Sequence, residues 1–66
     1  MNSLFTTKII INYVFERKKT EEEIDNFLNE HFPCEIHHIS NYVYLDSKTG
    51  NNILLTCVIL NLNEKD

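Results

Sequence analysis

The order of the strands is decided by residues 42–60, which read YVYLDSKTGNNILLTCVIL. Residues 46–51 are rich in turn-forming side chains and include Gly50, the one glycine of the chain, so they predict a connection between two strands. The residues from Asn52 to Asn63 are apolar at odd and even positions alike, which is typical of a strand that is buried on both faces. We therefore expect an antiparallel hairpin whose second strand is central in the sheet.

An N-terminal strand is predicted from Leu4 to Glu16. This segment alternates with a period of two residues and is rich in β-branched and aromatic side chains. Its odd-numbered positions are almost wholly apolar, and we expect them to meet the core. Its even-numbered positions are mixed, with Ile10 and Val14 as the apolar members.

A helix is expected at residues 21–31. Thr20 and Glu23 have the spacing of a capping box, in which the threonine hydroxyl accepts from the amide of Glu23 and the carboxylate reaches back. Pro33 cannot continue a helix and ends the segment. One helical face carries the apolar positions at i, i+3, i+4 and i+7, which are Ile24, Phe27, Leu28 and His31.

A further extended segment runs from Cys34 to Asp46, where Ser40 and Asn41 predict a bulge or bend. The element order is then β-α-β-β, and a crossover through the helix lets the first two strands run parallel. The simplest sheet places the last strand between them, in the order 1-3-2. Residues 1–66 are thus expected to form a single α+β domain, a three-stranded mixed sheet with one helix on one face, which is half of a ferredoxin-like split β-α-β fold.

One helix covers only one face of such a sheet. If the hairpin loop has an even number of residues, Tyr42 and Tyr44 share a face with Ile53 and Leu55, whereas an odd loop reverses this pairing. Either way an apolar stripe stays uncovered, and we expect a homodimer that forms by face-to-face sheet packing or by edge-strand pairing.

Composition excludes several classes of protein. The longest apolar run, Cys57 to Leu60, has four residues, whereas a membrane-spanning helix needs about 20. A secretory signal is not recognisable and two cysteines are too few for a disulfide scaffold, so a cytoplasmic location is expected. A net charge of −4 and a pI near 5.2 argue against direct nucleic-acid binding.

A cluster of potential ligands falls within eight residues, at His31, Cys34, His37 and His38. Its spacing is loosely compatible with zinc, but His37 and His38 point to opposite faces if they lie on a regular strand. A two-layer domain of this size also offers no deep cleft for catalysis. We therefore expect neither an enzyme nor a cofactor, and keep metal binding as an alternative.

The leading hypothesis for function is a small, non-enzymatic protein-binding inhibitor. Nine asparagines and eight isoleucines indicate AT-rich coding, which with the small size favours a phage or mobile-element protein that acts against a host defence system, as anti-CRISPR proteins do. One alternative is an oligomer that binds a nucleotide signal through Tyr42, Tyr44, His37, His38 and Lys48. Another is an antitoxin-like or regulatory subunit. The residues predicted to mediate interactions are Ile10, Val14, Tyr42, Tyr44, Ile53, Leu55, Glu22, Asp25 and Glu30.

Overall fold

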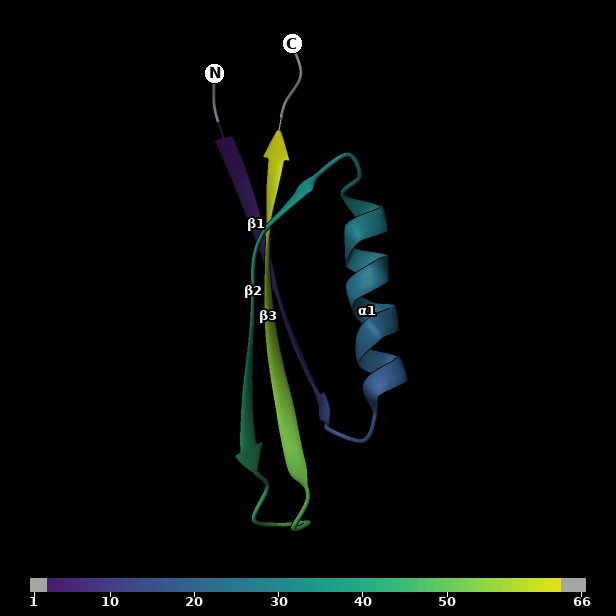
Figure 1. Cartoon of the computed structure of the whole chain (residues 1–66), viewed down its shortest axis with the longest axis vertical. Helices are drawn as coiled ribbons and strands as arrows, with labels where there is room; N and C mark the ends of the chain where they lie inside the picture. The colour runs from purple at the N-terminus through teal and green to yellow at the C-terminus, as the bar shows by residue number, and fades with distance from the viewer. Residues whose placement is uncertain (1–2, 64–66) are drawn as a thin grey trace.

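The computed structural model describes residues 3–63, in the order β1 (Ser3–Tyr13), α1 (Arg17–Glu30), β2 (Glu35–Leu45) and β3 (Asn52–Asn63) (Figure 1). β3 lies between β1 and β2 and pairs antiparallel with both. The chain is therefore an α+β protein, and the predicted strand order 1-3-2 is confirmed. The expectation of a mixed sheet is wrong, because β1 and β2 run in the same direction but pair only with β3.

The connection between β2 and β3 is a compact loop of residues 46–51. The backbone N–H of Asp46 donates to Asn51 at 2.9 Å, and the N–H of Gly50 donates to the carbonyl of Asp46 at 2.7 Å. Gly50 has a φ of +76°, in the left-handed region that glycine adopts without steric cost. The loop has an even number of residues, so Tyr42 lies opposite Leu55 and Tyr44 opposite Ile53, as the even-loop alternative requires.

The irregularity in β2 lies between Ile36 and His38, where the register with β3 shifts. The predicted bulge at Ser40 and Asn41 is wrong, because both residues pair regularly with β3. The hydroxyl of Thr56 donates to Oδ1 of Asn41 at 2.9 Å, which holds this part of the ladder in place.

The helix begins four residues earlier than expected and ends at Glu30, one residue early. The predicted capping box is wrong because Thr20 lies inside the helix, where its hydroxyl donates to the carbonyl of Glu16 at 3.3 Å. Glu16 occupies the N-cap position without a side-chain capping bond. Its carboxylate instead accepts from the backbone N–H of Tyr13 at 2.9 Å and closes the turn that ends β1.

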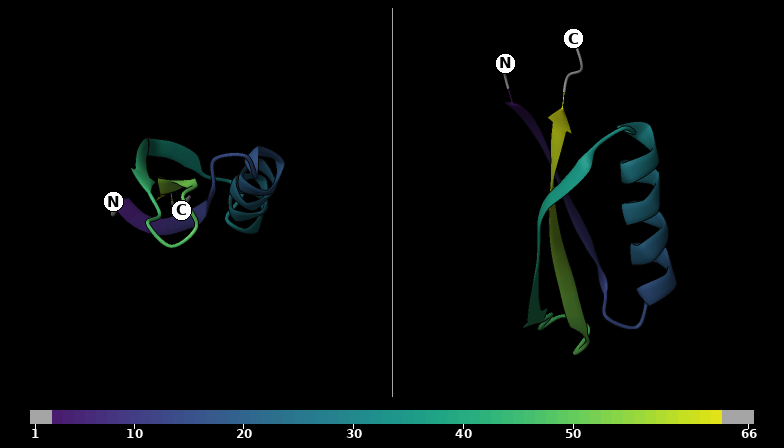
Figure 2. Two further views of the ribbon diagram at one scale, coloured as in Figure 1. Left: turned by 90° about the horizontal axis from the view of Figure 1, so that it is seen from below. Right: turned by 45° about the horizontal axis from the view of Figure 1, so that its top comes forward.

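The core lies between α1 and one face of the sheet (Figure 2). It is built from the even-numbered residues of β1 and β3, with Ile10 only 2% exposed. The expectation that the odd-numbered face of β1 meets the core is therefore wrong. The path of the crossover between the parallel strands β1 and β2, rather than the relative apolarity of the two faces, decides which face a helix covers. The buried residues are Ile10, Phe27, Val58 and Leu60, and Ile24, Leu28, Cys34 and Leu62 pack against them.

The molecule is long and thin, with principal extents of 50 × 18 × 12 Å. Its radius of gyration is 14.1 Å, whereas a compact domain of this length has about 11 Å. Its accessible surface is 5134 Å², against roughly 4,400 Å² for a typical monomer of 7.8 kDa. A single chain thus buries less of its surface than a compact monomer does.

Candidate interaction surface

The face of the sheet opposite α1 is uncovered in the single chain, and we call it the open face. Phe5, Ile9 and Ile11 of β1 are 53–57% exposed there, and Tyr42 of β2 is 67% exposed. The central strand β3 is half-buried on this side because its neighbours flank it. By register, the rows of the open face are Phe5, Thr7, Ile9, Ile11 and Tyr13 of β1, Asn61, Ile59, Cys57, Leu55 and Ile53 of β3, and Glu35, His38, Ser40, Tyr42 and Tyr44 of β2.

Aromatic contacts lie at both ends of the open face. At one end the rings of Phe5 and His37 meet edge-on, with centroids 4.9 Å apart, so the register shift brings His37 to the same side as His38. The expectation that these two histidines point to opposite faces is therefore wrong. At the other end the ring centroids of Tyr42 and Tyr44 lie 6.4 Å apart.

The predicted interaction residues are divided among three places. Tyr42, Tyr44, Ile53 and Leu55 lie together on the open face. Ile10 is buried beneath α1, so its prediction as a surface contact is wrong. Val14 is exposed in the turn after β1, while three acidic residues lie exposed on the helix. These acidic residues are Glu22, Asp25 and Glu30.

Sequence reasoning missed the β1 part of the open face. The odd-numbered positions are the more apolar set, which predicts Phe5, Ile9 and Ile11 in the core. It also missed Phe15 and Phe32, which flank α1 and are 70% and 79% exposed. Both faces of β1 carry isoleucines, so apolarity does not separate them. The covered face is distinguished by a tertiary contact, in which Asn12 finds polar partners in α1.

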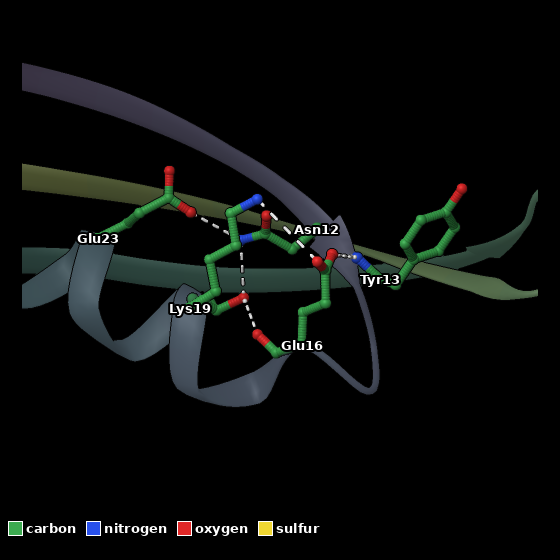
Figure 3. A network of polar contacts seen from close by, with 6 residues as sticks. Asn12, Tyr13, Glu16, Lys19 and Glu23 are labelled. Carbon is green, nitrogen blue, oxygen red and sulfur yellow. Dashed lines mark hydrogen bonds and ion pairs between the residues drawn. The ribbon is translucent and has the colours of Figure 1, made fainter.

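Asn12 belongs to a partly buried polar network between β1 and α1 (Figure 3). The Asn12 side-chain amide donates to the hydroxyl of Thr20 at 2.9 Å and to a carboxylate oxygen of Glu23 at 2.7 Å. Nearby, Nζ of Lys19 lies 4.0 Å from the Glu16 carboxylate. Asn12 and Thr20 are both buried, so the network fixes the helix against the sheet.

A shallow hollow of about 350 Å³ lies beside this network. It is open to solvent, and its apolar walls come from the end of the open face. The lining residues are Ile11, Asn12, Tyr13, Glu16, Lys19 and Ile53.

The cysteine and histidine cluster is not brought together. Nδ1 of His31 lies 3.0 Å from the carbonyl of Phe27, and the Cys34 thiol donates to the carbonyl of Leu28 at 3.7 Å. His37 and His38 lie on the open face. Within residues 3–63, no three His, Cys, Asp or Glu side chains are placed to hold one metal ion.

The residues of the nucleotide-binding alternative are also spread out. Lys48 lies in the hairpin loop, and His38 lies near the opposite end of β2. The seven steps of extended chain from His38 to Leu45 span about 23 Å. The tyrosines, histidines and lysine of one chain therefore do not surround one small ligand.

The one helix among the described residues is too short and too polar to cross a membrane. Comparison of the chain with models of known protein families, with curated proteins and with solved structures finds no match.

Proposed function

We propose that this is a non-enzymatic protein-binding protein that works as a homodimer, in which a second copy covers the open face. The exposure of that face carries the proposal, since Ile9, Ile11 and Tyr42 each keep more than half of their surface in water. A contiguous apolar patch of this kind marks an interaction site. Uncovered, it would also be a site of aggregation.

The area of the open face supports a second copy as its occupant. Its exposed large side chains, at exposed fractions of 40–67%, contribute on the order of 100 Å² each. With the half-exposed residues of β3 the apolar area reaches roughly 600 Å², close to the ~800 Å² that each partner contributes to a standard interface. One further chain that brings the same face therefore suffices. The exposed large residues are Phe5, Ile9, Ile11, Tyr42 and Tyr44.

The distribution of charge favours the same occupant. The chain has 16 charged residues, ten acidic and six basic, yet Glu35 is the one charged residue in the rows of the open face. Two copies, each with a net charge of −4, can therefore approach with little repulsion at the contact. The helices, which each carry five of the ten acidic side chains, lie on the outside of such a sandwich.

The architecture supports assembly as well. We interpret the β-α-β-β order as half of a ferredoxin-like fold, whose second half would add another helix and strand. That helix would lie on the side of α1 and that strand at the edge of β1, so the open face is left for a partner in the half and in the complete fold alike.

The test is the mass in solution of two variants on β1. Ile9→Glu places a carboxylate on the open face, and its matched control Leu4→Glu places one on the opposite face of the same strand, where Leu4 is 45% exposed. Light scattering at about 50 μM should show an oligomer for the wild type and for Leu4→Glu, and a lower mass for Ile9→Glu. A wild-type mass of 7.8 kDa, or equal masses for the two variants and the wild type, would overturn the proposal.

As a biological role we propose inhibition of a host defence system, of the anti-CRISPR type, by direct binding of a defence protein. This target class is supported by the small size, the acidity and the AT-rich coding. In the homodimer the open face is covered, so the target is bound by the outer surface. That surface presents Glu22, Asp25 and Glu30 of α1. Expression of the chain in a host that carries such a system should raise the plating efficiency of a sensitive phage. No rise against any of a panel of defence systems would refute this role.

A further inference from the structure

The outer edge of β2 is a second unpaired surface, separate from the open face. Every residue of β2 from Glu35 to Leu45 is exposed. An edge strand presents a row of unpaired backbone N–H and C=O groups, and natural proteins protect such edges with charges, prolines, bulges or a covering element. From His38 to Leu45 β2 carries no formal charge, no proline and no register shift.

The other edge strand is protected. β1 carries Lys8, whose ammonium group lies 5.9 Å from the centre of the Phe27 ring, and α1 packs chiefly against β1. This leaves β2 uncovered on the helix side of the sheet also, where Val43 is 55% and Leu45 63% exposed. β2 is therefore exposed on both faces and along its edge, although it is rich in β-branched and aromatic residues.

We propose that β2 pairs antiparallel with β2 of a second copy, about a two-fold axis at Asn41, to form a continuous six-stranded sheet. A two-fold axis normal to the sheet makes the same segment its own partner and keeps both helices on one side. The proposal uses a different surface from the open face and does not depend on the homodimer proposed above.

The position of the axis follows from the two-residue period of the side chains. Residues that face each other across the new pair must lie on the same side of the sheet, so the axis passes through a residue and not between two. The full uncharged run of β2, from Ile36 to Leu45 between Glu35 and Asp46, is centred on Ser40 and Asn41. An axis at Ser40 sets the apolar Ile39 against Asn41 of the partner subunit, whereas an axis at Asn41 sets it against Val43 of the partner subunit. The second arrangement pairs exposed apolar side chains and is the one we infer.

Both contacts are self-complementary and can coexist. The edge contact joins two chains side by side, and the open faces of two such six-stranded sheets can then pack together. Two perpendicular two-fold axes close this arrangement at four chains, a common symmetry for soluble oligomers.

The test is disulfide trapping in a chain whose native cysteines are replaced, Cys34→Ser and Cys57→Ser. With Ile39→Cys and Val43→Cys together, the proposed register sets each new cysteine opposite the other in the second copy, with Cβ atoms about 4.5–5.5 Å apart. Both positions are exposed, so the fold is expected to persist, and circular dichroism checks it. Mild oxidation should convert most of this protein to a covalent dimer on a non-reducing gel.

The matched controls are the single variants Ile39→Cys and Val43→Cys, whose cysteines have no cysteine opposite them in this register. They should give at least five-fold less covalent dimer. Equal cross-linking of the single and double variants, or no cross-linking of a folded double variant, would overturn the proposal.

A second measurement separates the two contacts. Val43→Lys adds the charge that protected edges carry, and its control Leu4→Lys adds the same charge to β1. The wild type should have four times the chain mass, Val43→Lys and Ile9→Glu twice, and the combined variant the mass of one chain. If Val43→Lys leaves the mass unchanged, the edge contact is wrong. If Ile9→Glu alone leaves it unchanged, the open-face homodimer is wrong.

Discussion

Replacement of Asn12 by alanine is expected to destabilise the domain by about 2–4 kcal/mol, because Asn12 joins β1 to α1. Its amide donates to the neutral hydroxyl of Thr20 at 2.9 Å and to the carboxylate of Glu23 at 2.7 Å. A neutral hydrogen bond contributes ~0.5–1.5 kcal/mol and one to a charged group ~1.5–3 kcal/mol. Thr20 is buried, so in the variant its hydroxyl would lose a donor that water cannot easily replace.

This loss is large for so small a protein. At ~0.05–0.15 kcal/mol per residue, the free energy of unfolding of 66 residues is about 3–10 kcal/mol. A loss of 2–4 kcal/mol lowers Tm by roughly 10–25 °C in a domain of this size. A large part of the total stability therefore depends on one polar side chain.

Urea denaturation followed by circular dichroism measures the effect, at one fixed protein concentration because oligomers couple unfolding to dissociation. The control is Asn26→Ala, since Asn26 is an exposed asparagine on α1 and its loss should change the free energy of unfolding by less than about 0.5 kcal/mol. A free energy of unfolding for Asn12→Ala within about 0.5 kcal/mol of that of the control would refute the role of the network. Additive losses would refute it as well: in that case the double variant Asn12→Ala/Thr20→Val loses the sum of what the two single variants lose.

Three further predictions concern the core, the hairpin and the central strand. Phe27→Ala removes the largest buried side chain of α1 and should cost about 3–5 kcal/mol, enough to leave a single chain largely unfolded by circular dichroism; retention of a cooperative melt above 50 °C would contradict this. Gly50→Ala should cost ~1 kcal/mol in urea titration because φ is +76° although there is open space for a methyl group, and Gly50→Asn should cost less; equal losses would contradict the conformational explanation. Thr56→Val removes the buried donor to Asn41 and should lower stability by about 1 kcal/mol, with faster amide hydrogen exchange in β2 than in β1; equal acceleration in both strands would show that the bond does not hold β2.

Local patterns predicted most of the fold. The turn at residues 46–51 and the doubly apolar strand after it give the hairpin and the central position of β3, and the predicted bounds Asn52 to Asn63 agree with the structure. The even length of that loop then fixes the faces of Tyr42 and Tyr44. These features depend on contacts between residues close in sequence, and the order of residue types along the chain is enough to predict such contacts.

The errors have a common physical origin. Thr20 has the residue type and spacing of a helix cap, but a partner eight residues earlier, Asn12, takes its hydroxyl into a tertiary network. In the same way the odd positions of β1 have the composition of a core, but the chain's path places α1 on the other side. Both outcomes depend on long-range contacts, and neither spacing nor apolarity contains them.

The helix covers the less apolar, even-numbered face of β1, and this finding is informative about assembly. In a monomeric domain, placing Ile9 and Ile11 in water while the mixed face carries the helix would be a conflict between local pattern and global fold, and natural sequences contain few such conflicts. A helix packs well on the mixed face because Asn12 and Lys8 find polar or aromatic partners there. A second sheet packs well against an uncharged apolar face, and the odd-numbered face of β1 carries no charged residue and includes Thr7, Ile9 and Ile11. Each face therefore suits a different neighbour, and the conflict disappears if a second copy covers the open face as proposed.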